Sequence, residues 1–108
     1  MDARAIKIKE QGPPSVMQIE RETISSPGDG EALVRQSAIG INFMDIYQRS
    51  GLYPLSLPSG IGLEAAGIVE GVGTGVSHIM PGDRVVYSGG KHFGGSIGED
   101  RGSKTSIF

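Results

Sequence analysis

The chain has 108 residues, 18 of which are glycine, and a formal net charge of −2. A chain of this length buries roughly two thirds of its unfolded surface as a single domain, and a second domain is excluded. The small negative charge provides no basic field for nucleic acid or an anionic membrane. Zero cysteines exclude disulfides and thiolate metal sites. Because no apolar run reaches membrane-spanning length and no signal peptide is present, we expect a soluble cytoplasmic protein.

Short strands flank one helix in the predicted order of elements. Alternating small, apolar and charged residues predict strands over residues 3–9, 16–22 and 31–39. Gly12-Pro13-Pro14 and Pro27-Gly28-Asp29-Gly30 supply the turns between them.

The helix follows directly, and its two ends carry recognisable signals. Asn42 can cap the first turn, and Asp45 three positions later supplies a reciprocal acceptor. Gly51 ends the helix. Phe43, Ile46 and Tyr47 fall on one apolar face.

An irregular loop rich in glycine and proline then carries Tyr53. Beyond it, Glu64–Val72 is predicted as a strand in which glycines let neighbouring backbone approach closely. Residues 84–87 form a further β-branched strand after the turn Pro81-Gly82-Asp83. Short strands separated by glycine or proline indicate a mainly β barrel or sandwich with one short helix.

The composition changes after Tyr87. Residues 88–108 contain six glycines, few large apolar residues and no period-two pattern, so we expect coil. A sheet without a closing strand there would keep an exposed edge, which predicts weak stability or self-association.

Three motifs in fixed order carry a family resemblance: GINFMDIYQRSGLYP, LPSGIGLEAAGIVEGVGTGV and PGDRVVY. From about residue 6 to residue 87 the chain resembles the N-terminal GroES-like domain of zinc-independent quinone oxidoreductases, the zeta-crystallin-like branch of the medium-chain dehydrogenase/reductases. The resemblance implies a GroES-like, partly open β-barrel with one short helix over residues 1–87, forming the substrate-side domain.

The tail, residues 88–108, departs from the family, and the family's nucleotide-binding domain is absent. Two interpretations compete for this stretch. It is either a divergent loop in a short natural protein or the product of a truncated, frame-shifted gene, and we favour the second.

The resemblance also implies that zinc is not bound. Zinc-dependent relatives place cysteine and histidine ligands where this chain has Asn42 and Leu63, and an amide and an isobutyl group cannot replace them. His78 and His92 have no neighbours at ligand spacing. We therefore predict no metal site.

The family cleft, where nicotinamide and quinone meet, gives the candidate pocket. The residues assigned to it are Asn42, Phe43, Tyr47, Tyr53 and Leu63, with Asn42 and Tyr47 on the nicotinamide side. From the sequence alone, Asn42 is a helix cap, and the three aromatic residues are core or turn residues. Tyrosine nevertheless combines an apolar ring with a polar hydroxyl, which suits a flat aromatic ligand.

Two further motifs have ordinary explanations. Gly71-Val72-Gly73-Thr74-Gly75 lacks the spacing and the following helix of a dinucleotide loop, so a β-turn is expected. Glu64 is either a buried acid beside the cleft or a strand-end carboxylate paired with arginine.

The predicted function is the substrate-side half of an enzyme that transfers hydride from NADPH to a quinone, and the expected ligand is a quinone or another flat electrophilic small molecule. Without a dinucleotide-binding loop this chain alone is expected to be inactive, and the full-length form is a possible homodimer. The alternative is a non-catalytic β-barrel module that binds a small apolar ligand or a partner protein.

Overall fold

The computed structural model describes residues 2–88 and 103–106. In chain order the elements are β1 (Asp2–Ile8), the 3-10 helix η1 (Pro14–Val16), β2 (Gln18–Thr23), β3 (Glu31–Gly40), α1 (Phe43–Ser50), β4 (Ser59–Gly60), β5 (Glu64–Val72), β6 (Arg84–Ser88) and β7 (Ser103–Ser106).

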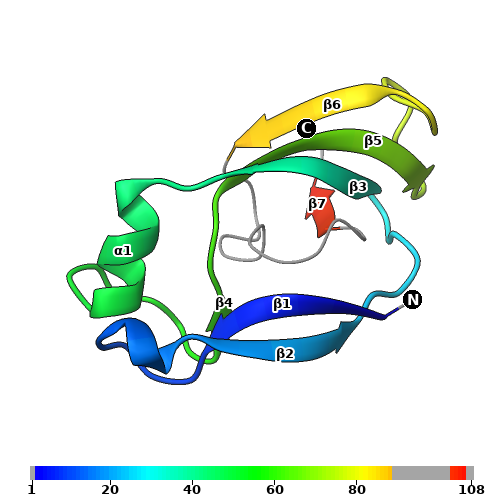
Figure 1. Cartoon of the computed structure of the whole chain (residues 1–108). Helices are drawn as coiled ribbons and strands as arrows, with labels where there is room; N and C mark the ends of the chain where they lie inside the picture. Colours follow the sequence, from blue (N-terminus) through cyan, green and yellow to red (C-terminus); the bar gives the residue numbers. More distant parts are fainter. Residues whose placement is uncertain (1, 89–102, 107–108) are drawn as a thin grey trace.

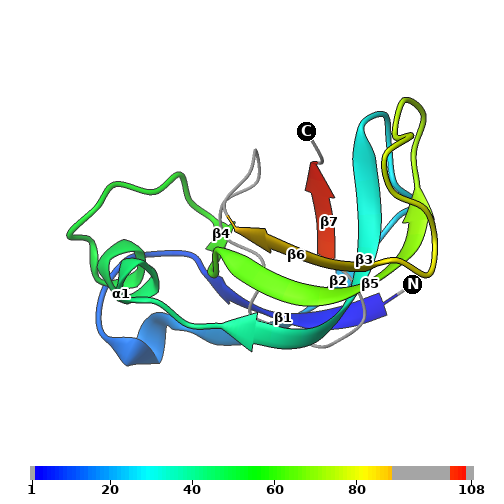
Figure 2. The same ribbon diagram turned by 90° about the horizontal axis from the view of Figure 1, so that it is seen from above.

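Among the described residues the strands form two antiparallel sheets that do not close into one barrel. One sheet has the order β2-β1-β4 and the other has the order β6-β5-β3-β7. Figure 1 shows the two sheets above one another with α1 at one end, and Figure 2 shows the same arrangement from above. The predicted mainly β fold, a partly open GroES-like barrel with one short helix, is confirmed.

The core lies between the inner faces of the sheets. It is built from small and β-branched side chains, most of them on the strands: Ala3, Ala5, Ile8, Ala32, Val34, Ile61, Ala65 and Val69. Ile61 sits in the short segment between β4 and β5, where the chain passes from one sheet to the other. The segment that connects the two sheets is therefore itself anchored in the core by Ile61.

Close backbone approach explains one of the glycines in β5. An added Cβ at Gly67 would lie 2.0 Å from the carbonyl oxygen of Arg35 on β3. The register shifts in this region, between Gln36 and Ala38, which is a bulge-like irregularity. The predicted role of strand glycine is confirmed at this position.

The predicted strands match the observed ones within two residues, and the helix and Glu64–Val72 agree fully. The expectation of coil after Tyr87 is wrong at Ser88, which belongs to β6. It is also wrong at Ser103–Ser106, which form β7 and pair with residues 31–34 of β3. The unpaired backbone N–H and C=O groups at the edge of β3 can hydrogen-bond to an extended segment whatever its side chains are. The polar sequence of residues 103–106 therefore does not exclude a strand. The rest of the predicted coil lies outside the described residues.

Candidate functional site

The site is built at the end of β3, where the chain turns into α1. Asn42 is the N-cap, and its backbone N–H donates to Asp45 Oδ2 at 2.8 Å. At the other end Gly51 adopts a left-handed conformation with φ of 99°, and its N–H donates to the Tyr47 carbonyl. Both predicted end signals are therefore present.

The buried side of α1 is polar. Asp45 is 4% exposed and Gln48 is 9% exposed. Together with Asn42 they form a stripe at positions i, i+3 and i+6. Within the described residues, Asn42 Nδ2, Asp45 Oδ1 and Gln48 Oε1 are buried and have no hydrogen-bond partner. This stripe holds one unused donor and two unused acceptors.

A side chain from the loop between β1 and η1 anchors the C-terminal half of the helix to the loop that follows it. Gln11 Nε2 donates to the carbonyls of Gln48 and Tyr53, each at 2.8 Å. In the same region the Gly12 N–H donates to the Arg49 carbonyl at 2.8 Å, and the Arg49 guanidinium donates back to the Gly12 carbonyl. These contacts set the position of the loop residue Tyr53 relative to α1.

Three aromatic rings line up on the exposed side of the helix and its loop. The rings of Phe43 and Tyr47 stack with centroids 6.4 Å apart at 18°, and Tyr47 meets Tyr53 edge-on at 5.4 Å and 75°. Phe43 is 74% exposed, and Tyr53 is also exposed. The core interpretation is therefore wrong for these two residues. The three rings form a surface that is open to a flat ligand or a partner.

Leu63 lies at the same end of the sheet, in the segment just before β5. Gly40 on β3 pairs with Glu64 on β5, so Asn42 lies two residues beyond one strand end and Leu63 lies one residue before the facing one. The Leu63 side chain is half-buried. The topology thus gathers the segments of all five assigned residues at one end of the barrel, and ring contacts join the three aromatic ones.

Sequence reasoning missed the contribution of Gln11 and Gln48. The spacing of Asn42, Asp45 and Gln48 along one helix face was a usable signal for the polar stripe. Gln11 carries no local signal, because its two acceptors lie more than thirty positions away in the chain.

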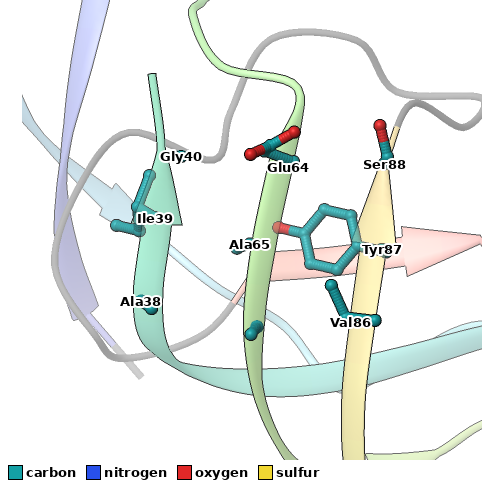
Figure 3. Close-up of a pocket in the computed structure, with 9 residues that line it drawn as sticks. Ala38, Ile39, Gly40, Glu64, Ala65, Val86, Tyr87 and Ser88 are labelled. Carbon is teal, nitrogen blue, oxygen red and sulfur yellow. The ribbon is translucent and has the colours of Figure 1, made fainter. Parts of the chain in front are cut away.

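A second feature, a hollow of about 320 Å³, opens on the sheet at the ends of three neighbouring strands. Figure 3 shows it between the end of β3, the start of β5 and the end of β6. Its polar side chains are Glu64, Tyr87 and Ser88. Glu64 is half-buried, and no arginine pairs with it within the described part of the chain.

Two turn predictions are confirmed at the opposite end of β5 and β6. Asp83 Oδ2 accepts from the Met80 N–H at 3.0 Å, so this carboxylate serves the turn. Residues 74 and 75 form a turn after β5, with no helix following the glycine motif.

Within residues 2–88 and 103–106 no three metal-ligating side chains cluster together. In the same part of the chain, α1 is far too short and too polar to cross a membrane.

Two unclosed antiparallel sheets with one capped helix define a small β domain of the partly open barrel class. The family model for the alcohol dehydrogenase GroES-like domain matches residues 28–103. The chain belongs to the alcohol dehydrogenase GroES-like domain family.

Its relatives are named as oxidoreductases. Quinone oxidoreductase 1 of Escherichia coli is 55% identical over 87 residues, which is 80% of this chain and 27% of the relative. Quinone oxidoreductase of Pseudomonas aeruginosa is 47% identical over 89 residues, 82% of this chain and 27% of the relative. The solved structure of Escherichia coli quinone oxidoreductase complexed with NADPH superimposes with a TM-score of 0.85 and 46% identity, covering 96% of this chain and 31% of that one. The chain therefore spans under a third of the length of these relatives.

Proposed function

We propose that this chain is the substrate-side half of an NADPH-dependent quinone reductase. The supporting observation is the buried, unused Asn42 amide at the start of a helix that, together with the loop after it, carries three touching aromatic rings. A quinone is a flat apolar ring with two carbonyl acceptors. Its binding requires an aromatic surface and a hydrogen-bond donor. The three rings offer the surface on the outer side of α1, and Asn42 offers the donor on the inner side of the start of the helix.

In this proposal each residue has a definite role. Asn42 Nδ2 donates to a carbonyl oxygen of the quinone or of the nicotinamide carboxamide. Tyr47 and Phe43 support one face of the ring pair, and Tyr53 closes its edge. Leu63 contributes apolar surface from the β5 side. Hydride transfer between two flat partners depends mainly on their alignment, so few acidic or basic groups are needed.

NADPH is the proposed reductant, and only its nicotinamide end would contact this chain. Binding of the pyrophosphate in the proposed enzyme requires a glycine-rich turn between a strand and a helix. In the described residues α1 follows the antiparallel strand β3, and its N-terminus is occupied by Asn42 and Asp45. The dinucleotide site would therefore come from a separate domain, and we expect no turnover by the 108-residue chain.

Ligand binding by the chain alone tests the proposal. We suggest a titration with 2-methyl-1,4-naphthoquinone followed by two-dimensional NMR, because the absence of cysteine removes the usual reaction of this quinone with thiols. The Asn42 side-chain amide and the Phe43, Tyr47 and Tyr53 ring signals should shift together and saturably. Saturable shifts confined to other residues, or no shift at millimolar quinone, would refute the assigned site.

Zinc independence is part of the same proposal. Asn42 and Leu63 stand at the two places where the family's zinc enzymes carry ligands. Elemental analysis after dialysis against micromolar zinc should find no stoichiometric metal. One zinc per chain would overturn this part of the proposal.

A non-catalytic binding module is the second candidate, and one observation favours it. Exposed large apolar side chains extend beyond the aromatic rings over α1 and its flanking segments: Ile41, Met44, Ile46, Leu52 and Leu57. A patch of this kind is typical of a protein-binding surface. If the quinone leaves the aromatic signals unchanged, this candidate replaces the first.

A further inference from the structure

Strand β6 forms one edge of the larger sheet, with β5 as its only neighbour among the described strands. Figure 1 shows β6 on the outer side of that sheet. Val86 at its centre is 79% exposed. Edge strands are normally protected by charges, proline or bulges. The edge strand β2 carries Glu20, Arg21 and Glu22, whereas β6 has Arg84 alone.

Two charges near this edge have no partner in the described part of the chain. Glu64 lines the hollow beside Ser88, and Arg84 is exposed at the start of β6. Neither takes part in an ion pair or a side-chain hydrogen bond there. Glu64 pairs with Ser88, whereas Arg84 pairs with Ile68. The two charges are therefore about 13 Å apart along the sheet and cannot meet within one molecule.

We infer that β6 pairs with β6 of a second copy of this chain, antiparallel and about a two-fold axis through Val86. In that register the two Val86 side chains face each other, and Arg84 lies opposite Ser88 of the second copy. No like charges are placed opposite one another. A two-fold axis makes the same surface serve both copies, so each contact occurs twice.

The pairing of β5 with β6 inside each copy adds Glu64 to the pair formed by Ser88 and Arg84 of the second copy. Glu64 pairs with Ser88, so all three residues, Glu64, Ser88 and Arg84 of the second copy, lie on the same face. The Cα atoms of Glu64 and of that arginine are then about 10 Å apart, two strand spacings. An arginine side chain crosses a serine easily and can reach a glutamate at this separation. The pairing thus supplies the missing partner for both charges.

Glu64 is free to make this contact. Its carboxylate leans over Gly40, where an added Cβ would lie 1.9 Å from Oε1. No described group holds it in that position, and the hollow gives it room to turn toward Ser88 (Figure 3).

Cross-linking gives the first test, because the chain has no cysteine of its own. Val86→Cys places two thiols opposite each other at the two-fold axis, at a Cα separation of about 5 Å that permits a disulfide. With copper phenanthroline it should form a dimer within minutes at micromolar protein. Ile19→Cys is the matched control, since Ile19 is 68% exposed on the edge strand β2. It should cross-link at least about tenfold more slowly.

Charge reversal gives the second test, by sedimentation equilibrium of the full chain. Arg84→Glu and Glu64→Arg should each raise the dimer Kd by about tenfold or more, because two attractive contacts become repulsive. The double variant should restore the original Kd. Within one molecule these residues are too far apart to compensate, so rescue reports a contact between copies. Circular dichroism checks that each variant is folded.

A chain that stays monomeric at about 1 mM, the range of weak association, would overturn the inference. So would equal cross-linking of the two cysteine variants, or a double variant as weak as the single ones. A dimer that Phe43→Ser dissociates, while Arg84→Glu leaves it intact, would place the interface on the aromatic surface and equally refute pairing through β6.

Discussion

Asn42 has two separable properties, a capping oxygen and an unused amide donor. Serine caps helices about as well as asparagine but has no amide. Asn42→Ser should therefore change the free energy of unfolding by only about 0.5 kcal/mol, whereas Asn42→Ala should cost about 1 kcal/mol. Urea unfolding followed by circular dichroism measures both.

The same two variants separate structure from binding. If the amide is the donor to the quinone carbonyl, both variants should bind 2-methyl-1,4-naphthoquinone more weakly, by about tenfold for one lost hydrogen bond. Full binding by Asn42→Ser would show that Asn42 acts only as a cap.

Gly67 and Gly71 both lie in β5, and they differ in the space around them. A Cβ at Gly67 would collide with the Arg35 carbonyl, whereas at Gly71 the nearest atom is 3.8 Å away, on Pro27. Gly67→Ala should therefore lose about 3 kcal/mol of stability or more, and Gly71→Ala should stay within about 0.5 kcal/mol of the wild type. Equal urea midpoints for the two variants would contradict the packing of β3 on β5.

At the scale of elements, α1 is held by polar contacts, with its apolar side exposed. Gln11→Ala removes two hydrogen bonds, one part-buried to the Gln48 carbonyl and one exposed to the Tyr53 carbonyl, so it should cost about 1–3 kcal/mol. Ile46→Gln, on the exposed side, should change stability by about 0.5 kcal/mol at most. Urea unfolding of the two variants makes the comparison. A larger loss for Ile46→Gln would show that the apolar face is buried in solution.

Much of this element arrangement could be predicted from the sequence. Asn42 and Gly51 marked the helix ends, and alternation identified β5 to the residue. Hydrophobic spacing finds an apolar helix face, but it cannot say which side packs on the chain. That is why the burial of Asp45 and Gln48 was not foreseen. β7 was missed for a related reason, since its pairing is decided by the available edge of β3 and not by its own polar sequence.

The candidate pocket, too, could be predicted only in part. The family resemblance selected Asn42, Tyr47 and Tyr53, and the structure brings their segments to one end of the barrel. The unused Asn42 amide depends on three-dimensional burial and could not be read from the sequence. The hollow beside Glu64 depends on the register of three strands, which a single sequence does not determine.

At the scale of the whole molecule, the proposed enzyme is a domain that aligns a quinone but needs a separate domain for NADPH. The isolated chain should oxidise NADPH with 2-methyl-1,4-naphthoquinone no faster than the uncatalysed background, as measured by absorbance in a stopped-flow instrument. Saturable turnover by the chain would mean that it holds the cofactor unaided and would contradict this division of roles.

The most direct test of the central claim is a chimera with Escherichia coli quinone oxidoreductase 1, which is 55% identical to this chain over 87 residues. Residues 1–87 of this chain would replace the matching segment of that enzyme, and NADPH oxidation with 2-methyl-1,4-naphthoquinone would be measured, with the Asn42→Ser chimera as the control. The proposal predicts quinone reduction within about tenfold of the parent enzyme, and a clearly lower kcat/KM for the control. A chimera that folds and binds NADPH but does not reduce the quinone would contradict it.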